Sequence, residues 1–222
     1  MFNVKEFVDN NVSKFVFSKE NDIVVETVLY KYNGYDERTV ICCSTQCGCP
    51  VACTFCGTGN NFIRNLTADE IIYQVDYLIN EKVLKEIKTT DEIKKFQIMF
   101  MSMGEPMFNF SSVKKAIREL NQKYPNAKLL LSTVGVKNNN VLSEILEVAK
   151  EIQNVGLQFS IHQANEEKRN KLIPYKNKMN FRIIEKYKTK DNNIDPQDVA
   201  DYFNVGCRDV IDRGRVLGFF YI

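Results

Sequence analysis

The chain has 222 residues, 44% of them hydrophobic and 26% charged, which predicts one globular domain and excludes fibrous and low-complexity classes. The formal net charge is +2, close to neutral. No apolar run approaches the ~20 residues that a membrane span needs, and the first residues lack the apolar stretch of a signal peptide. We therefore expect a cytoplasmic protein without membrane contact.

The first elements predicted along the chain form a β-hairpin. Residues 14–18 and 23–30 have the composition of strands, and the polar residues 19–22 between them are typical of a turn. The N-terminal part of the chain is therefore expected to be a two-stranded extension of whatever follows.

Strands and helices alternate from about residue 37 onward. Three helices are predicted: one opened by a capping box over residues 67–70, one that begins at Ser111 or Ser112, and one over about residues 139–152. The strand candidates are apolar runs at residues 39–43, 96–101, 129–133 and 157–161. Alternation of this kind predicts an α/β fold with a parallel sheet covered by helices. In (β/α) barrels, which are built in this way, the catalytic groups lie at the carboxyl ends of the strands.

The first of these strands runs into a cluster of cysteines. Six of the seven cysteines lie within residues 42–56, which favours metal chemistry in a reducing compartment over disulfides. Cys49, Cys53 and Cys56 follow a C-x3-C-x2-C spacing. Three thiolates on one short loop suit a [4Fe–4S] cluster, which is then left with one iron open to another ligand.

Two other interpretations of the cysteines stay open. A structural zinc site needs a fourth ligand, usually as two spaced pairs, so Cys42, Cys43 or Cys47 would have to complete it and the spacing disfavours zinc. The cysteines could also be inert and buried, acting as small hydrophobic residues.

The other predicted strands also end in polar residues. The second ends in the run at 103–106 (MGEP), the third in the run at 132–135 (STVG), and the fourth in Ser160 to His162 (SIH). His162 is the only histidine of the chain. The carboxyl ends of parallel strands meet at one edge of a sheet. We therefore expect His162 to belong to a functional site at that edge, rather than to be an ordinary packed or surface histidine.

The MGEP run offers two useful groups. Gly104 allows close approach of the backbone, and the carboxylate of Glu105 can pair with an ammonium group. The alternative for Glu105 is an ordinary turn acid.

A basic stretch lies near the end of this region. Residues 168–190 contain nine Lys and Arg and one acid, Glu185. Such a stretch can attract a phosphate backbone, but a solvated helix face has the same composition.

These motifs together resemble the radical-SAM superfamily, and within it the RlmN/Cfr family of RNA adenine-C2/C8 methyltransferases. The superfamily resemblance rests on the three cysteines with Phe55 before the last of them. The family resemblance spans about residues 15–188 and rests on six blocks in family order: residues 15–29, 42–59, 64–71, 101–109, 132–136 and 160–174.

The resemblance implies a partial (β/α) radical-SAM barrel with a [4Fe–4S] cluster on Cys49, Cys53 and Cys56. The open iron would chelate S-adenosylmethionine (SAM), and one-electron reduction would then release a 5′-deoxyadenosyl radical. The resemblance also implies contacts between the protein and SAM. The residues that would make them are Gly104, Glu105, Ser132, Ser160, Ile161 and His162.

The family's later steps imply further roles and partners. Its members place a methyl group on a C-terminal cysteine before adding it to an adenine of rRNA or tRNA, and an electron donor such as flavodoxin or ferredoxin reduces the cluster. Glu26 matches the proposed proton acceptor, although it could be an outward-facing strand acid, and Cys42 matches the cysteine that helps release the product. Cys43 and Cys47 are extra, and Cys47 is expected to pack.

After about residue 188 the chain departs from the family. The expected Ala-Cys-Gly segment is absent, and Cys207, the candidate methyl carrier, lacks its usual neighbours. A short helix from Asp195 and an apolar run at 216–222 are predicted instead. Only 14 residues precede the first matching block, so we expect no counterpart in this sequence of the family's N-terminal helical RNA-binding region.

We therefore predict three segments: an N-terminal β-hairpin extension (1–36), a truncated radical-SAM core (37–190) and a divergent C-terminal segment (191–222). An open barrel exposes a sheet edge, which the hairpin or a partner must cover. Two alternatives to an RNA methyltransferase remain: a radical-SAM enzyme with another substrate, and a non-catalytic cluster- or SAM-binding remnant.

Overall fold

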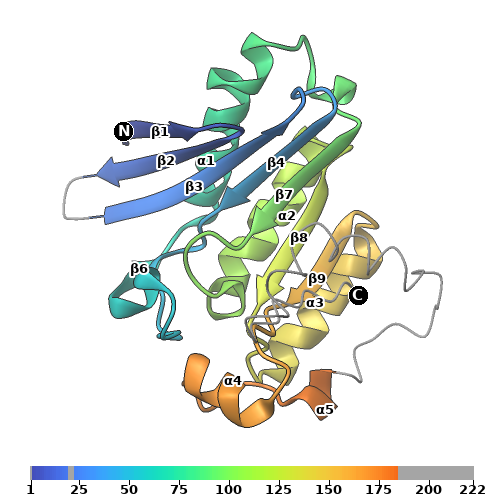
Figure 1. Cartoon of the computed structure of the whole chain (residues 1–222). Helices are drawn as coiled ribbons and strands as arrows, with labels where there is room; N and C mark the ends of the chain where they lie inside the picture. Colours follow the sequence, from blue (N-terminus) through green and yellow to red (C-terminus); the bar gives the residue numbers. More distant parts are fainter. Residues whose placement is uncertain (1, 20–22, 185–222) are drawn as a thin grey trace.

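A seven-stranded sheet runs through the part of the chain that the computed structural model describes, residues 2–19 and 23–184 (Figure 1). The strand order is β1-β2-β3-β4-β7-β8-β9. The pairs from β1 to β4 are antiparallel, and those from β4 to β9 are parallel. The strands are β1 (Asn3–Asp9), β2 (Val12–Lys19), β3 (Ile23–Tyr32), β4 (Arg38–Cys43), β7 (Lys95–Phe100), β8 (Lys128–Thr133) and β9 (Val155–Phe159).

The sequence predicts the four parallel strands well. The first three agree with the structure to within one residue at each end. The fourth was expected over residues 157–161, and this is wrong by two residues because β9 ends at Phe159. The register with β8 stops at that residue, and His162 adopts a left-handed φ of 59° that no strand continues. The SIH run therefore forms a loop beyond the strand.

The N-terminal extension has one more strand than expected. The hairpin of β2 and β3 is confirmed, and β1 adds to its outer edge. Six of the seven β1 residues are exposed, so its sequence carries no alternation that would reveal it. β3 pairs antiparallel with β4, so the extension covers that edge of the parallel sheet, as the hairpin was expected to do.

Three helices cover one face of the sheet: α1 (Ala68–Glu81), α2 (Phe110–Lys123) and α3 (Asn139–Glu151). The predicted capping box forms at Thr67 and Glu70. α2 begins earlier than predicted because a 3-10 turn, η4 (Pro106–Asn109), leads directly into it. The remaining short elements are β5 (Gln46–Gly48), η1 (Gly57–Asn60), β6 (Phe62–Asn65), η2 (Val83–Lys85), η3 (Thr90–Glu92), α4 (Glu166–Leu172) and α5 (Phe181–Ile184).

The two faces of the parallel strands bury different residues. Successive strand residues point to opposite faces, so the neighbours Cys42 and Cys43 lie on different sides. Cys43 belongs to the main core under the helices, whereas Cys42 belongs to a second cluster with Val40, Met99 and Leu130. Burial under the helices is where most of the hydrophobic stabilisation of the fold arises.

The carboxyl ends of the parallel strands converge at one end of the sheet. β5 and β6 pair as a small separate sheet beside them, and the segment between these two strands, residues 49–61, carries the three spaced cysteines and is called the cysteine loop below. Figure 1 shows β6 and α4 at this same end. The polar runs that follow β4, β7, β8 and β9 therefore all lead to this end of the sheet, as the sequence predicts.

Within the described part of the chain, no helix is both long and apolar enough to cross a membrane. The predicted segment 191–222, with its short helix, its apolar run and Cys207, lies outside the described residues.

The capping-box residue Glu70 also forms an ion pair with Arg64, and the contribution of this pair to stability can be tested. Arg64 donates to Glu70 at 2.7 and 2.8 Å, and these bonds hold the pKa of Glu70 below its usual value. Glu70→Gln keeps an acceptor for the N–H of Thr67 but loses the ion pair with Arg64, so it should lower the free energy of unfolding by about 1 kcal/mol at neutral pH, as measured by urea denaturation. Because a lowered carboxyl pKa stabilises above its unfolded value of 4.5, the difference should narrow as pH falls through that value.

A matched control is Glu81→Gln, which removes an exposed ion pair with Lys85 and should cost about 0.5 kcal/mol or less. Equal stability of wild type and Glu70→Gln at neutral pH would contradict the role assigned to the ion pair between Arg64 and Glu70.

Candidate functional site

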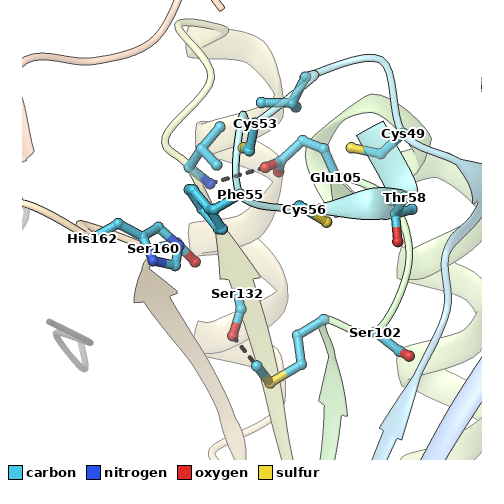
Figure 2. A pocket seen from close by; sticks show the side chains of 14 residues that line it. Cys49, Cys53, Phe55, Cys56, Thr58, Ser102, Glu105, Ser132, Ser160 and His162 are labelled. Carbon is cyan, nitrogen blue, oxygen red and sulfur yellow. Dashed lines mark hydrogen bonds between the residues drawn. The ribbon is translucent and has the colours of Figure 1, made fainter. Parts of the chain in front are cut away.

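A cavity lies where the cysteine loop meets the ends of β7, β8 and β9 (Figure 2). All three spaced cysteines line it, together with Val51, Phe55 and Thr58 of the same loop. The opposite wall is made by strand-end residues: Met101, Ser102, Gly104, Glu105, Ser132, Val134, Ser160 and His162. Thiols, hydroxyls, a carboxyl and an imidazole therefore face one space.

The three cavity cysteines are free thiols. Burial is the main cause that raises the pKa of Cys49 to about 11 and that of Cys53 to about 12. At neutral pH both are therefore protonated in the absence of a cation, and a bound iron would have to displace their protons. Soft thiolates are the donors that iron–sulfur clusters use.

The cysteine geometry disfavours a single-ion site. No three His, Cys, Asp or Glu of the described residues are arranged to hold one metal ion. This does not conflict with a [4Fe–4S] cluster, because each thiolate then binds a different iron and the sulfurs lie farther apart.

The other described cysteines do not complete a zinc tetrahedron. The thiol of Cys43 lies 3.6 Å from the carbonyl of Met99, and that of Cys47 lies 3.3 Å from the carbonyl of Val24. Cys42 belongs to the second apolar cluster. Cys47 is 2% exposed in the main core, where it packs as predicted.

The shape of the cysteine loop depends on close backbone contacts. Gly48, which precedes it, has a φ of +77°, and a Cβ there would lie 1.8 Å from the carbonyl oxygen of Asn61. The N–H of Cys49 donates to the carbonyls of Asn61 and Thr58 at 3.2 and 3.1 Å. The loop therefore closes on itself just before its first thiol, which fixes where that thiol lies.

The end of β7 places a buried carboxyl group in the cavity wall. Glu105 is 2% exposed, and its carboxylate accepts hydrogen bonds from the N–H groups of Met107 and Val134 at 3.1 and 2.9 Å (Figure 2). Burial raises the pKa of Glu105 to about 7 despite these bonds. An ammonium group in the cavity would favour the ionised form, so this carboxyl is suited to bind one.

The ends of β8 and β9 supply neutral polar groups. The hydroxyl of Ser132 donates to the amide oxygen of Gln158 at 2.8 Å. The His162 ring lies 4.6 Å from that of Phe55, centroid to centroid. Burial, reinforced by Arg169, lowers the pKa of His162 to about 4, so at neutral pH the imidazole is uncharged. It can then both donate and accept a hydrogen bond.

Two of the described residues predicted to act in chemistry, Glu26 and Cys42, do not line the cavity. Glu26 lies on β3 in a 3.3 Å ion pair with Lys14, both partly exposed. Cys42 is 7% exposed, and burial raises its pKa to about 12. Cys207 lies outside the described residues. Ile161, assigned to cofactor contact, has a side chain that packs in the main core.

Two cations of the basic stretch at residues 168–190 are buried, although its composition suggests a solvated face. Arg169 is 0% exposed and Lys178 is 7% exposed, so neither belongs to a solvated face or a phosphate-binding patch. Their burial was not predicted. The available signal was the spacing of Arg169 three residues before Leu172, an apolar residue of the same helix that packs against the main core.

Comparison with known protein families gives a match over most of the chain. The sequence model of the Radical SAM superfamily matches residues 43–195. This range begins one residue after Cys42 and includes the cysteine loop and all of the strand-end runs.

Similar proteins point in the same direction. The chain is 37% identical to a probable dual-specificity RNA methyltransferase RlmN of Chlorobium phaeobacteroides, over 73% of this chain and 43% of that protein. It is 34% identical to the RlmN protein of Fervidobacterium nodosum, over 82% of this chain and 50% of that protein. The crystal structure of a radical SAM methyltransferase from Sphaerobacter thermophilus is 31% identical with a TM-score of 0.63, over 78% of this chain and 49% of that one. The chain thus spans about half the length of the relatives it matches.

Gly104 allows a test of the cavity wall that does not depend on any cofactor. It has a φ of +96°, and a Cβ there would lie 2.6 Å from the Cβ of Gln46. Gly104→Ala should therefore lower the free energy of unfolding by about 2 kcal/mol in urea denaturation, through backbone strain and overlap.

Gly57→Ala is the matched control, because a Cβ at Gly57 meets nothing within 4 Å. Its stability should stay within about 0.5 kcal/mol of wild type. Wild-type stability of Gly104→Ala would show that the wall is not built as described.

Proposed function

The chain belongs to the radical SAM superfamily, and from that premise we propose that it binds a [4Fe–4S] cluster through Cys49, Cys53 and Cys56 and cleaves SAM reductively. The observation that carries the proposal is the convergence of three free thiols and a buried carboxyl group on one cavity. The superfamily implies both cofactors, and the donor set fits them. Three thiolates leave one of the irons open to SAM.

Cys49, Cys53 and Cys56 would hold the cluster, which would supply the one electron needed to break a C–S bond of the SAM sulfonium, giving methionine and a 5′-deoxyadenosyl radical. The protein's own residues bind and orient the substrate. Glu105 would pair with the ammonium of the methionine end, and Gly104 lets the backbone approach it. Ser132, Ser160 and the neutral His162 would offer hydrogen bonds to the remainder.

For the whole protein we propose methylation of an adenine in rRNA or tRNA, carried out in the cytoplasm. The support is similarity to probable dual-specificity RNA methyltransferases, at 34–37% identity for the two relatives above. Glu26 would accept a proton, Cys42 would help release the product, and Cys207 remains the candidate methyl carrier. A flavodoxin or ferredoxin would supply the electron.

One observation favours a second candidate, SAM cleavage directed at another substrate. Of the groups assigned to the methyl-transfer steps, Glu26 is paired with Lys14 and Cys42 is buried, and neither lines the cavity. The groups assigned to the cluster and to SAM, by contrast, lie together. SAM cleavage therefore has more structural support than methyl transfer.

Cluster binding is tested by replacing one proposed ligand. After anaerobic reconstitution the wild type should bind about four irons per chain and show thiolate-to-iron absorption. Cys53→Ala should lose that absorption, because two thiolates do not hold the cluster. Cys43→Ala is the control, since this buried thiol is outside the cavity and its loss should leave iron content unchanged. Unchanged absorption in Cys53→Ala would overturn the assignment.

SAM cleavage is tested by product analysis. The reconstituted wild type, given SAM and dithionite, should release 5′-deoxyadenosine, measured by liquid chromatography. Glu105→Gln should bind iron normally but release the product at a rate at least tenfold lower, because its neutral amide pairs poorly with an ammonium group. A loaded cluster that yields no 5′-deoxyadenosine would favour a non-catalytic binding protein.

A further inference from the structure

Arg169 is the largest fully buried side chain of the described residues, with 0% exposure. It lies on α4, a short helix at the same end of the sheet as the cysteine loop. A charged side chain in this position is costly unless another charge compensates it, because burial removes its hydration. A negative charge close to the guanidinium, from the protein or from a bound group, would compensate this cost.

Hydrogen bonds hold the guanidinium in place without cancelling its charge. One terminal nitrogen donates to the carbonyl of Met179 and the other to the carbonyl of Val134, each at 2.8 Å. The buried Nε has no hydrogen-bond partner among the described residues. The nearby acid is Glu166, 3.6 Å away with a side chain 35% exposed to solvent. Solvent screens such a contact, so much of the positive charge stays uncompensated.

The guanidinium is linked to the cavity from two sides. Val134, whose carbonyl it binds, lines the cavity and donates its N–H to Glu105. The carbonyl of Leu172, on the same helix as Arg169, accepts a 2.9 Å hydrogen bond from the N–H of Thr54, which follows Cys53. A second cation, Lys178, is 7% exposed nearby, and its pKa is lowered by burial and then by the charge of Arg169.

We propose that Arg169 is a fixed cation of the cluster site, which raises the reduction potential of a cluster bound to Cys49, Cys53 and Cys56. This inference rests on the proposed function. Each thiolate adds negative charge, and reduction by one electron adds more. A cation held nearby in a medium of low dielectric stabilises the reduced form more than the oxidised form. Arg169 acts through the cluster and is a positioning residue, not a catalytic one.

The test is a redox titration of the reconstituted full chain, followed by the electron paramagnetic resonance signal of the reduced cluster. In Arg169→Met the ratio of reduced to oxidised cluster at a fixed potential should fall at least tenfold, which is about 59 mV for one electron. Arg169→Lys keeps the charge and should recover most of that loss. If Arg169 had a purely structural role, the reduction potential of the cluster would not follow the charge at position 169 in this way.

Glu166→Gln gives an independent reading of opposite sign. It removes the negative charge beside Arg169, while an amide oxygen can still accept the hydrogen bond from the N–H of Phe181. The ratio of reduced to oxidised cluster should therefore rise, by less than Arg169→Met lowers it because solvent screens the charge of Glu166. Arg169→Gln, which removes the positive charge but keeps an N–H donor for the carbonyl of Val134, decides the question if Arg169→Met does not fold.

A loaded Arg169→Met or Arg169→Gln that titrates at the wild-type potential would overturn the inference. Failure of the wild type to bind iron would instead refute the proposed function. The two failures are therefore distinguishable.

Discussion

The cavity depends on the buried side chain of Gln46, which connects the segment before the cysteine loop to the end of β7. Its amide oxygen accepts a hydrogen bond from the N–H of Glu105 at 2.8 Å, and its amide nitrogen donates to Asn65 at 2.7 Å. Gly104 packs so closely against it that no other side chain fits there. Since a buried amide must satisfy its hydrogen bonds, the loop and the strand end cannot shift independently.

This contact joins two regions with different roles: the apolar core under the helices and the polar surroundings of the cavity. Under the helices the sheet is apolar, and burial there stabilises the fold. Around the cavity, buried polar and charged groups such as Glu105, after β7, and Arg169, on α4, replace apolar ones, at a cost in stability. Groups held in this way, with shifted pKa values and restricted geometry, are typical of functional sites.

Local sequence patterns predict most of the fold. The capping box at Thr67, the three helices and three of the four parallel strands depend on residues close together in the chain, and they are confirmed. β1 was not predicted, because an exposed edge strand has no apolar periodicity. The end of β9 was misplaced, because the left-handed φ of His162 is not visible in an apolar run.

The site was predicted in part, for similar physical reasons. The three cysteines, Glu105 and His162 follow strands whose ends must meet, so their convergence on one cavity could be expected. Gln46 and Arg169 could not, since their roles come from partners such as Val134 that are distant in sequence. A basic stretch also indicates solvent exposure by default, which concealed the burial of Arg169.

The central claim is that three protein thiolates hold a cluster and leave one iron for SAM. Mössbauer spectroscopy of the iron-loaded chain, with and without SAM, tests it most directly. SAM should change the signal of about a quarter of the iron, because one iron of the cluster would have no protein ligand. A spectrum that SAM leaves unchanged, or one of a single tetrahedral iron, would contradict it.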